Sequence, residues 1–147
     1  KQDVTGNVEY DADNHEFMTH MRAEKINRIA RTIPATEVFG PDKGSLLILG
    51  WGGTYGAIRS AVARAIEEGQ SVAHAHIRHL NPFPSDLKEI MSRYDRVLIP
   101  ELNTGHLRTM IRAEYLIDAI GLNKVQGRPF SVEDIRARID QLLGGKA

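Results

Sequence analysis

Short apolar runs alternate with segments of helical period along most of the chain. Residues 46–49 read Leu-Leu-Ile-Leu without a polar interruption, which is typical of a strand that is covered on both faces. The next segment places apolar residues at helical spacing. Repetition of this cycle predicts strands at residues 46–49, 72–77, 97–99 and 123–126, and helices at residues 55–66, 85–94 (capped by Ser85), 106–119 and from Ser131 onward.

The alternation of strands and helices indicates the fold class. Such a pattern needs right-handed crossovers and places a mainly parallel sheet between helical layers. We therefore predict a three-layer α/β/α domain with four to five strands, to which residues 36–39 can add an edge strand. If residues 46–49 form the central strand, with residues 72–77 and 97–99 on either side, the strand order reverses there, which is where open sheets bind ligands and partners.

The first 34 residues are predicted to form a separate region, a linker arm and one helix, ahead of the α/β domain at residues 35–147. The start of this region is polar and rich in Asn, Asp and Gly. Asp13 or Asn14 can cap a helix that runs to about Thr32, since both side chains accept hydrogen bonds from the free amides of a first helical turn.

This N-terminal helix has an apolar side. Met18 and Met21 lie on it together with several isoleucines, and we expect both methionines to be buried in a core. Pro34 then ends the helix, because proline lacks an amide donor and its ring clashes with the preceding turn.

Composition and charge exclude several classes of function. Lys plus Arg and Asp plus Glu both number 19, so the chain lacks the basic excess of a nucleic-acid-binding protein. Cysteine is absent, so this chain cannot ligate an iron–sulfur cluster through thiolates or use a thiol nucleophile. No apolar run approaches the ~20 residues that cross a bilayer, and we expect a cytoplasmic location without membrane contact. The first residue is Lys1, so we expect part of a longer polypeptide.

Three loops leave the carboxyl ends of the predicted strands, at residues 50–54, 78–84 and 101–105. We select ten residues in or beside them as candidates for an interface or for facing a site: Trp51, Gly52, Thr54, Tyr55, Arg78, Asn81, Phe83, Glu101, Asn103 and His106. Rigid loops with aromatic and arginine side chains fit a docking surface. No nucleophile–base pair stands out, so we predict no catalytic residue in this chain.

The glycine-rich turn allows a second interpretation, a stand-alone nucleotide-binding module that uses residues 50–56. A dinucleotide fingerprint requires a third glycine where Tyr55 stands, and an acidic residue after the second strand where Arg78 and His79 stand. An arginine there can face a 2′-phosphate, which keeps an NADP site as the alternative. A tight turn that presents Trp51 at a surface is the simpler interpretation.

Three histidines suggest a metal site, which the residue types argue against. His74 and His76 point to the same face of a strand, with His79 just beyond it. Two imidazoles without a nearby carboxylate or cysteine make a poor site, so we expect packed or hydrogen-bonded histidines and no metal ligand. Glu101 is a candidate acid, but no partner base can be identified.

Four segments carry a resemblance to a known family. The four segments are residues 49–57 (LGWGGTYGA), 77–84 (IRHLNPFP), 99–105 (IPELNTG) and 123–130 (NKVQGRPF). They occur in the same order and at the same spacing as in the family. These segments resemble the alpha subunits of 2-oxoacid:ferredoxin oxidoreductases, notably the 2-oxoglutarate enzymes. The leading residues also look like the linker that follows the family's thiamine-pyrimidine domain. The resemblance covers nearly the whole chain.

The resemblance implies a C-terminal domain of the alpha polypeptide, similar to the C-terminal domain of transketolase and with an antiparallel edge strand that residues 36–39 can supply. In the family, thiamine diphosphate and magnesium lie between the pyrimidine domain of alpha and the beta subunit. Electrons pass through an iron–sulfur cluster to ferredoxin, and the products are CO2 and an acyl-CoA formed from coenzyme A. We expect none of these cofactors to be bound by this chain.

The leading hypothesis is therefore a subunit-packing domain. Its partners are the thiamine-pyrimidine domain of the same polypeptide and the beta subunit, with ferredoxin reached through the whole enzyme only. Family members commonly have serine where Gly53 stands and glutamine where His106 stands, so contacts at these positions differ from the family's. A third interpretation is a non-enzymatic interaction domain of another assembly.

Overall fold

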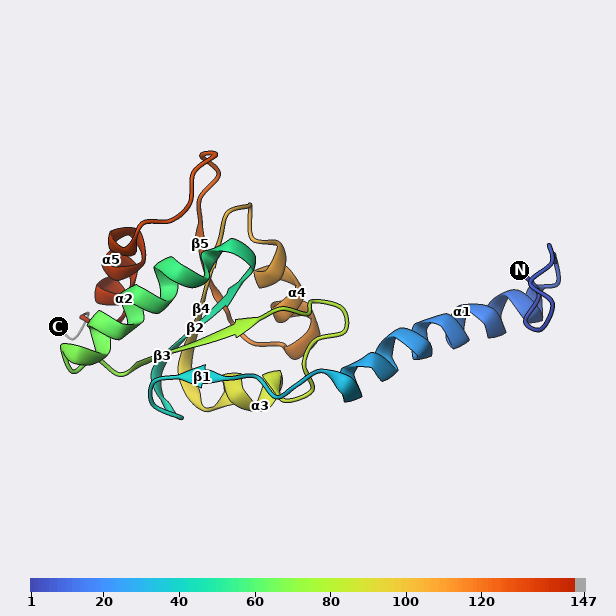
Figure 1. Cartoon of the computed structure of the whole chain (residues 1–147), viewed down its shortest axis with the longest axis horizontal. Helices are drawn as coiled ribbons and strands as arrows, with labels where there is room; N and C mark the ends of the chain where they lie inside the picture. Colours follow the sequence, from blue (N-terminus) through green and yellow to red (C-terminus); the bar gives the residue numbers. More distant parts are fainter. Residues whose placement is uncertain (145–147) are drawn as a thin grey trace.

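A five-stranded sheet forms the centre of the molecule, and one long helix extends away from it (Figure 1). The computed structural model describes residues 1–144. Its strands are β1 (Val38–Phe39), β2 (Gly44–Trp51), β3 (Val72–Ile77), β4 (Tyr94–Glu101) and β5 (Ile120–Asn123). Its helices are α1 (Ala12–Arg28), α2 (Tyr55–Glu67), α3 (Leu87–Ser92), α4 (His106–Tyr115) and α5 (Val132–Leu143), with 3₁₀ turns at Ile29–Thr32 and Gly52–Thr54.

The strand order confirms the predicted topology. The order is β1-β3-β2-β4-β5, so the apolar strand β2 is central, with β3 and β4 beside it. The pairs β2–β3, β2–β4 and β4–β5 are parallel, and β1 pairs antiparallel with β3. The edge strand expected within residues 36–39 is therefore present and has the expected direction.

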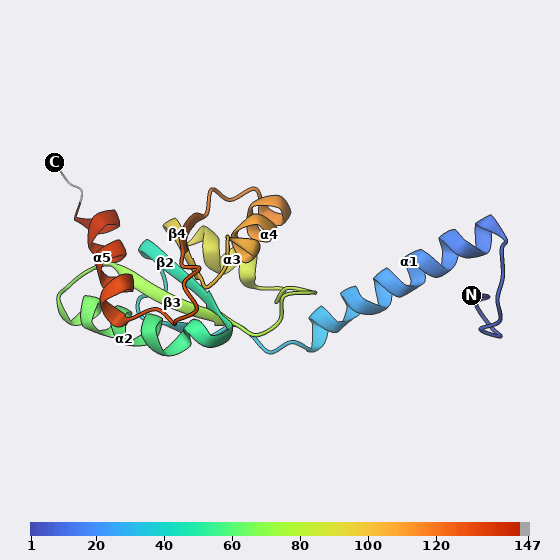
Figure 2. The ribbon, with the colours of Figure 1, turned by 90° about the horizontal axis from the view of Figure 1, so that it is seen from above.

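The alternation along β2 explains why its run is wholly apolar. Leu47 and Leu49 pack in one hydrophobic cluster with residues of α3 and α4. Leu46 and Ile48 point to the opposite face and pack with residues of α2 and α5. Figure 2 shows the two pairs of helices on opposite sides of the sheet. Helices therefore cover both faces of β2 and exclude water from them, which confirms the three-layer α/β/α architecture.

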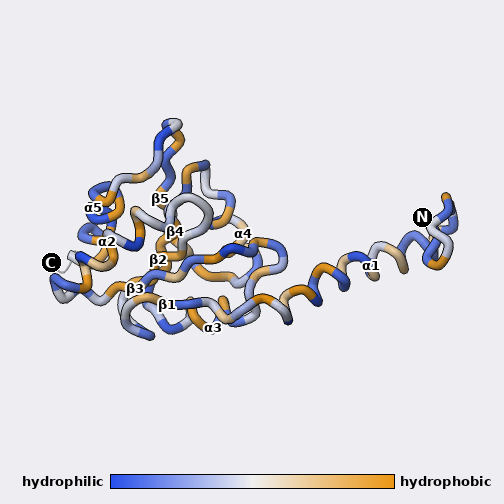
Figure 3. The backbone as a smooth tube through the Cα atoms, viewed as in Figure 1, coloured by the Kyte–Doolittle hydropathy of each residue, from blue (hydrophilic) through white to orange (hydrophobic). Residues whose placement is uncertain are grey.

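Helix α1 lies outside these layers. Asp11 caps it by accepting a hydrogen bond from the amide of Asn14 at 2.7 Å, so neither Asp13 nor Asn14 is the cap. No residue of α1 is buried, and the helix extends away from the sheet (Figure 1). Figure 3 shows apolar and polar positions interspersed along it. The expectation that Met18 and Met21 are core residues is wrong, because the helix projects beyond the surface that could cover them.

Two boundaries in the middle of the chain also differ from prediction. Helix α3 starts after Asp86 rather than Ser85, and Asp86 instead accepts hydrogen bonds from the backbone amide and hydroxyl of Thr36, at 2.6 and 2.8 Å. Tyr94 belongs to β4 rather than to the helix, because it pairs with Gly44 and its hydroxyl donates to the carbonyl of Pro41 at 2.6 Å.

In the C-terminal part, one helix ends earlier than the predicted residue 119, one strand lies earlier than predicted, and one predicted helix cap is confirmed. Helix α4 ends at Tyr115, and Leu116 follows in a left-handed conformation with φ 56°. Strand β5 is Ile120–Asn123 rather than residues 123–126, because its pairing partners on β4 begin at Leu98. Ser131 caps α5 as predicted, in a reciprocal capping box with Asp134. Within the described residues, no helix combines the length and hydrophobicity needed to span a bilayer.

Candidate functional site

The turn after β2 places the first candidates at the carboxyl edge of the sheet. Trp51 ends the strand and is half-buried against the cluster under α3 and α4. Gly52 follows with φ 58°, a conformation that a side chain would strain. Thr54 is buried, and its hydroxyl donates to the carbonyl of Trp51 at 2.8 Å. Thr54 thus closes the turn and does not contribute to a surface.

The structure brings four of the ten candidates together. Trp51, Gly52, Tyr55 and Arg78 line one shallow cavity of about 460 Å³, with His76, Ile77 and Leu80 completing its wall. Tyr55 is half exposed and Arg78 is exposed. This cavity lies where β2 and β3 end, so the loops that follow these two strands meet at the carboxyl edge of the sheet.

Asn81 and Phe83 lie further along the second loop and are not part of this cavity. Asn81 is exposed and precedes a cis peptide bond to Pro82. Phe83 turns inward and packs against Tyr115 of α4, with 5.8 Å between ring centroids. Phe83 therefore attaches the loop to the core and offers only part of its ring to the surface.

The third group, Glu101, Asn103 and His106, organises the start of α4. Glu101 is fully buried, and its two carboxylate oxygens accept from the backbone amides of Leu107 at 2.7 Å and Arg108 at 3.1 Å. Asn103 accepts from the amide of the exposed His106 at 3.0 Å. Both Glu101 oxygens bind free amides of a helix N-terminus. Glu101 is therefore a structural anchor, and its side chain does not reach the surface as a candidate acid would.

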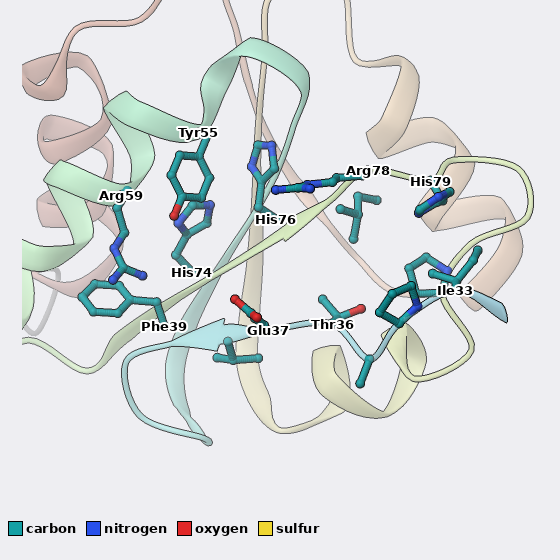
Figure 4. A pocket seen from close by; sticks show the side chains of 15 residues that line it. Ile33, Thr36, Glu37, Phe39, Tyr55, Arg59, His74, His76, Arg78 and His79 are labelled. Carbon is teal, nitrogen blue, oxygen red and sulfur yellow. The ribbon is translucent and has the colours of Figure 1, made fainter. Parts of the chain in front are cut away.

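Two histidines of β3 pack together beside this edge of the sheet. His74 and His76 lie on the same face of β3, as expected, and Tyr55 packs on them at centroid distances of 5.5 and 5.1 Å (Figure 4). Gly50, opposite His76 in the ladder, leaves room for both rings, because an added Cβ would lie 2.8 Å from His76 Nδ1. Packing was predicted, but His74 Nε2 and His76 Nδ1 have no hydrogen-bond partner among the described residues.

The electrostatics keep these histidines uncharged. The pKa of His74 is lowered to about 3, mainly by burial, with smaller contributions from the neighbouring His76 and Arg59. Burial is also the main cause that lowers the pKa of His76. Both rings are consequently neutral at pH 7, so each offers one N–H donor and one acceptor nitrogen.

A larger cavity of about 570 Å³ opens beside the histidines, between β3 and the segment that joins α1 to the sheet. Its lining includes Glu37 from that segment, Arg59 from α2 and Arg78 after β3 (Figure 4). The guanidinium of Arg59 lies 3.1 Å from the ring centroid of Phe39. These residues come from segments far apart in the chain, and only Arg78 was selected from the sequence.

The donor set of this chain does not fit the cofactors of the family. Among residues 1–144, no three His, Asp or Glu side chains are grouped so that they could hold a metal ion. The chain has no cysteine, so it offers no thiolate to an iron–sulfur cluster.

Several known proteins are similar to this chain in sequence and in fold. A family model, pyruvate:ferredoxin oxidoreductase core domain II, matches residues 45–135. The 2-oxoglutarate oxidoreductase subunit KorA of Mycobacterium tuberculosis is 41% identical over 143 residues, which are 97% of this chain and 22% of that protein. A solved 2-oxoglutarate:ferredoxin oxidoreductase from Magnetococcus marinus, with 2-oxoglutarate, coenzyme A and succinyl-CoA bound, has a TM-score of 0.90 at 32% identity, covering 97% of this chain and 25% of that one.

A more distant structure shows the fold alone. A split-gene transketolase, solved as an inactive beta4 tetramer, has a TM-score of 0.58 at 19% identity and covers 77% of this chain and 42% of that one. The similarity to transketolase expected from the sequence is thus confirmed. These relatives give no support to a stand-alone nucleotide-binding module or to a non-enzymatic interaction domain.

The chain is shorter than the curated relatives, since it spans only 22% of the length of the mycobacterial subunit. The matched residues nevertheless include β2 to β5, the helices α2 to α4 and the first residues of α5. The chain belongs to the 2-oxoacid:ferredoxin oxidoreductase family and contains its core domain II.

Proposed function

We propose that this chain is the C-terminal domain of the alpha subunit of a thiamine-dependent 2-oxoglutarate:ferredoxin oxidoreductase. The main support is structural similarity. The chain superposes over 97% of its length, with a TM-score of 0.90, on an enzyme solved with 2-oxoglutarate, coenzyme A and succinyl-CoA bound. In the proposed whole enzyme, decarboxylation of the 2-oxoacid releases CO2, coenzyme A takes the acyl group, and two electrons leave through an iron–sulfur cluster to ferredoxin. The proposed location is the cytoplasm.

Within that enzyme, the proposed role of this domain is to order subunit packing. Tyr55 and Arg78 are exposed at the carboxyl edge of the sheet beside the half-buried Trp51, and Leu102 is 40% exposed in the neighbouring loop. Aromatic and arginine side chains of this kind dominate the binding energy of many interfaces. The proposed partners are the thiamine-pyrimidine domain of the same polypeptide and the beta subunit, with residues 1–34 as the linker between the two alpha domains.

The thiamine diphosphate, magnesium and iron–sulfur cluster are proposed to be held by other domains. The support is the donor set described above, which contains no thiolate and, in the described part of the chain, no three-ligand group. Calorimetric titration of the chain with thiamine diphosphate and magnesium should then give no binding heat. Saturable binding in this titration would contradict the assignment of the cofactor to other domains.

The packing role is tested by assembly of the whole alpha subunit with the beta subunit. Trp51→Ala and Arg78→Ala should each weaken assembly, and the loss at Trp51 should reach about 2 kcal/mol, the usual threshold of an interface hot spot. Leu116→Ala is the matched control, because Leu116 is 90% exposed at the end of α4 that lies at the opposite edge of the sheet. Analytical ultracentrifugation gives the dissociation constants.

Thermal unfolding separates the interface role from a purely internal one. Trp51 contacts the core, so Trp51→Ala should also lower the melting temperature. Arg78 is exposed, so Arg78→Ala should leave the melting temperature unchanged. Unchanged assembly of both variants would refute the packing role and leave Trp51 as a core residue only.

A further inference from the structure

The cavity between β3 and the segment at residues 33–39 has the features of a binding site. Its volume of about 570 Å³ is within the range of small-molecule pockets. We propose that it binds a small free carboxylate between Arg59 and Arg78. Arg78 is shared with the packing surface proposed above, whereas Arg59 and Glu37 line this cavity alone, so the Arg59 and Glu37 variants test the cavity separately from assembly.

The two arginines supply the charge. Neither forms an ion pair with any residue from 1 to 144, although eight ion pairs are present elsewhere in this part of the chain. Arg59 is half-buried, and its guanidinium carbon lies 3.1 Å from the centroid of the Phe39 ring. A guanidinium that is already oriented and partly dehydrated loses little entropy on binding, and its planar fork matches a carboxylate.

The histidine wall supplies polar groups without partners. His74 is only 2% exposed and lines the cavity, yet its Nε2 atom has no hydrogen-bond partner in the described chain. A buried polar atom without a partner lowers stability, and an apolar side chain at this position would avoid that loss. Gly50 is needed at the same place, because any side chain there would displace the rings. Gly50 therefore keeps room for the two neutral rings in the wall of the cavity, although both unpartnered nitrogens are closed off from solvent.

The charges around the cavity favour an anion over a cation. Glu37 is the one acidic side chain among its lining residues, which also include two arginines. The positive charge of Arg59 already helps to lower the pKa of His74, so the local potential is positive. No three-ligand group for a metal ion is present among the described residues. Glu37 should repel a bound carboxylate. Removing its charge should therefore strengthen binding, whereas removing an arginine should weaken it.

The experiment titrates the 147-residue chain with succinate and, in parallel, with succinamide, which has a similar shape without charge. Ring-proton NMR signals of His74 and His76 should shift saturably with succinate only. Arg59→Met should weaken binding about tenfold or more, the usual effect of losing a charge-assisted hydrogen bond. Glu37→Gln should tighten it. Arg96→Met is the control, because Arg96 is an exposed arginine on β4 outside the cavity lining.

Three results would overturn the proposal: no saturable response to succinate, an equal response to succinamide, or weaker binding by the Glu37→Gln variant. If Arg59→Met does not fold, Arg78→Met provides the same test at an exposed position. Retention of full affinity by the Arg78→Met variant would then also count against the site.

Discussion

Lowering the pH from 7 to 5 should destabilise the folded chain through His74. This side chain is buried on β3, and its pKa falls from the ordinary value of 6.5 to about 3 because of burial, with further contributions from His76 and Arg59. The unfolded chain therefore binds a proton at this position more readily than the folded chain. Stability is complete above pH 6.5 and declines as the pH falls from 6.5 towards 3.

The expected magnitude follows from the difference between the two states. At pH 5 the unfolded imidazole is nearly fully protonated, whereas His74 in the folded chain remains neutral. Each pKa unit corresponds to about 1.4 kcal/mol, and roughly 1.5 units separate pH 5 from the unfolded pKa. His74 alone should therefore remove about 2 kcal/mol from the free energy of unfolding, which is a large part of the stability of a typical domain.

Urea unfolding followed by circular dichroism at pH 7, 6 and 5 measures this effect. The chain is compared with His74→Phe, which keeps a ring but cannot titrate, and with His15→Phe at an exposed position of α1 as the control. His76 has a lowered pKa too and contributes to the slope in every variant. His74→Phe should lose about 2 kcal/mol less between pH 7 and pH 5 than the unmodified chain. Equal pH slopes for these two proteins would refute the reasoning.

Three further predictions concern stability, each measured as the free energy of unfolding in urea. Glu101→Ala should cost about 2–4 kcal/mol, because two buried backbone amides lose a charged acceptor; a loss under half of that would mean that water replaces the carboxylate. Gly50→Ala should cost about 1–3 kcal/mol, because the new Cβ would lie 2.7 Å from Ile58 Cδ1, whereas Gly56→Ala meets open space and should not destabilise. Ser131→Ala should cost about 1 kcal/mol through loss of the capping box, and no change would show that Asp134 alone satisfies the end of the helix.

The centre of the sheet could be predicted because its physical signal is local. Four consecutive apolar residues can be accommodated only where both faces of a strand are covered, and this placed β2 in the middle. Strand β5 has no such signal. Three of its four residues are half-buried and Asn123 is exposed, and pairing with β4 rather than local hydrophobicity determines where it begins. The predicted position was therefore three residues too late.

The site was predictable only in part, for a similar reason. The turn with Trp51 and the loop with Arg78 follow adjacent strands, so their convergence could be derived from topology. The larger cavity needs the antiparallel pairing of β1 with β3, which brings Glu37 across from residues about 40 positions later. The function of Asp86 was missed for the same reason, since its hydrogen-bond partner Thr36 is 50 residues away.

The link between Thr36 and Asp86 has a mechanical consequence for the N-terminal helix. Two hydrogen bonds fix the chain to the start of α3 only a few residues after the 3₁₀ turn that ends at Thr32, and Pro34 stiffens the short connection. Helix α1 spans 17 residues, or about 25 Å at the usual rise per residue. Acting as a lever, it converts a tilt of about 10° at this pivot into a displacement of about 4 Å at its far end. The point from which α1 leaves the sheet domain is thus fixed by one carboxylate on the opposite side of the sheet from α2.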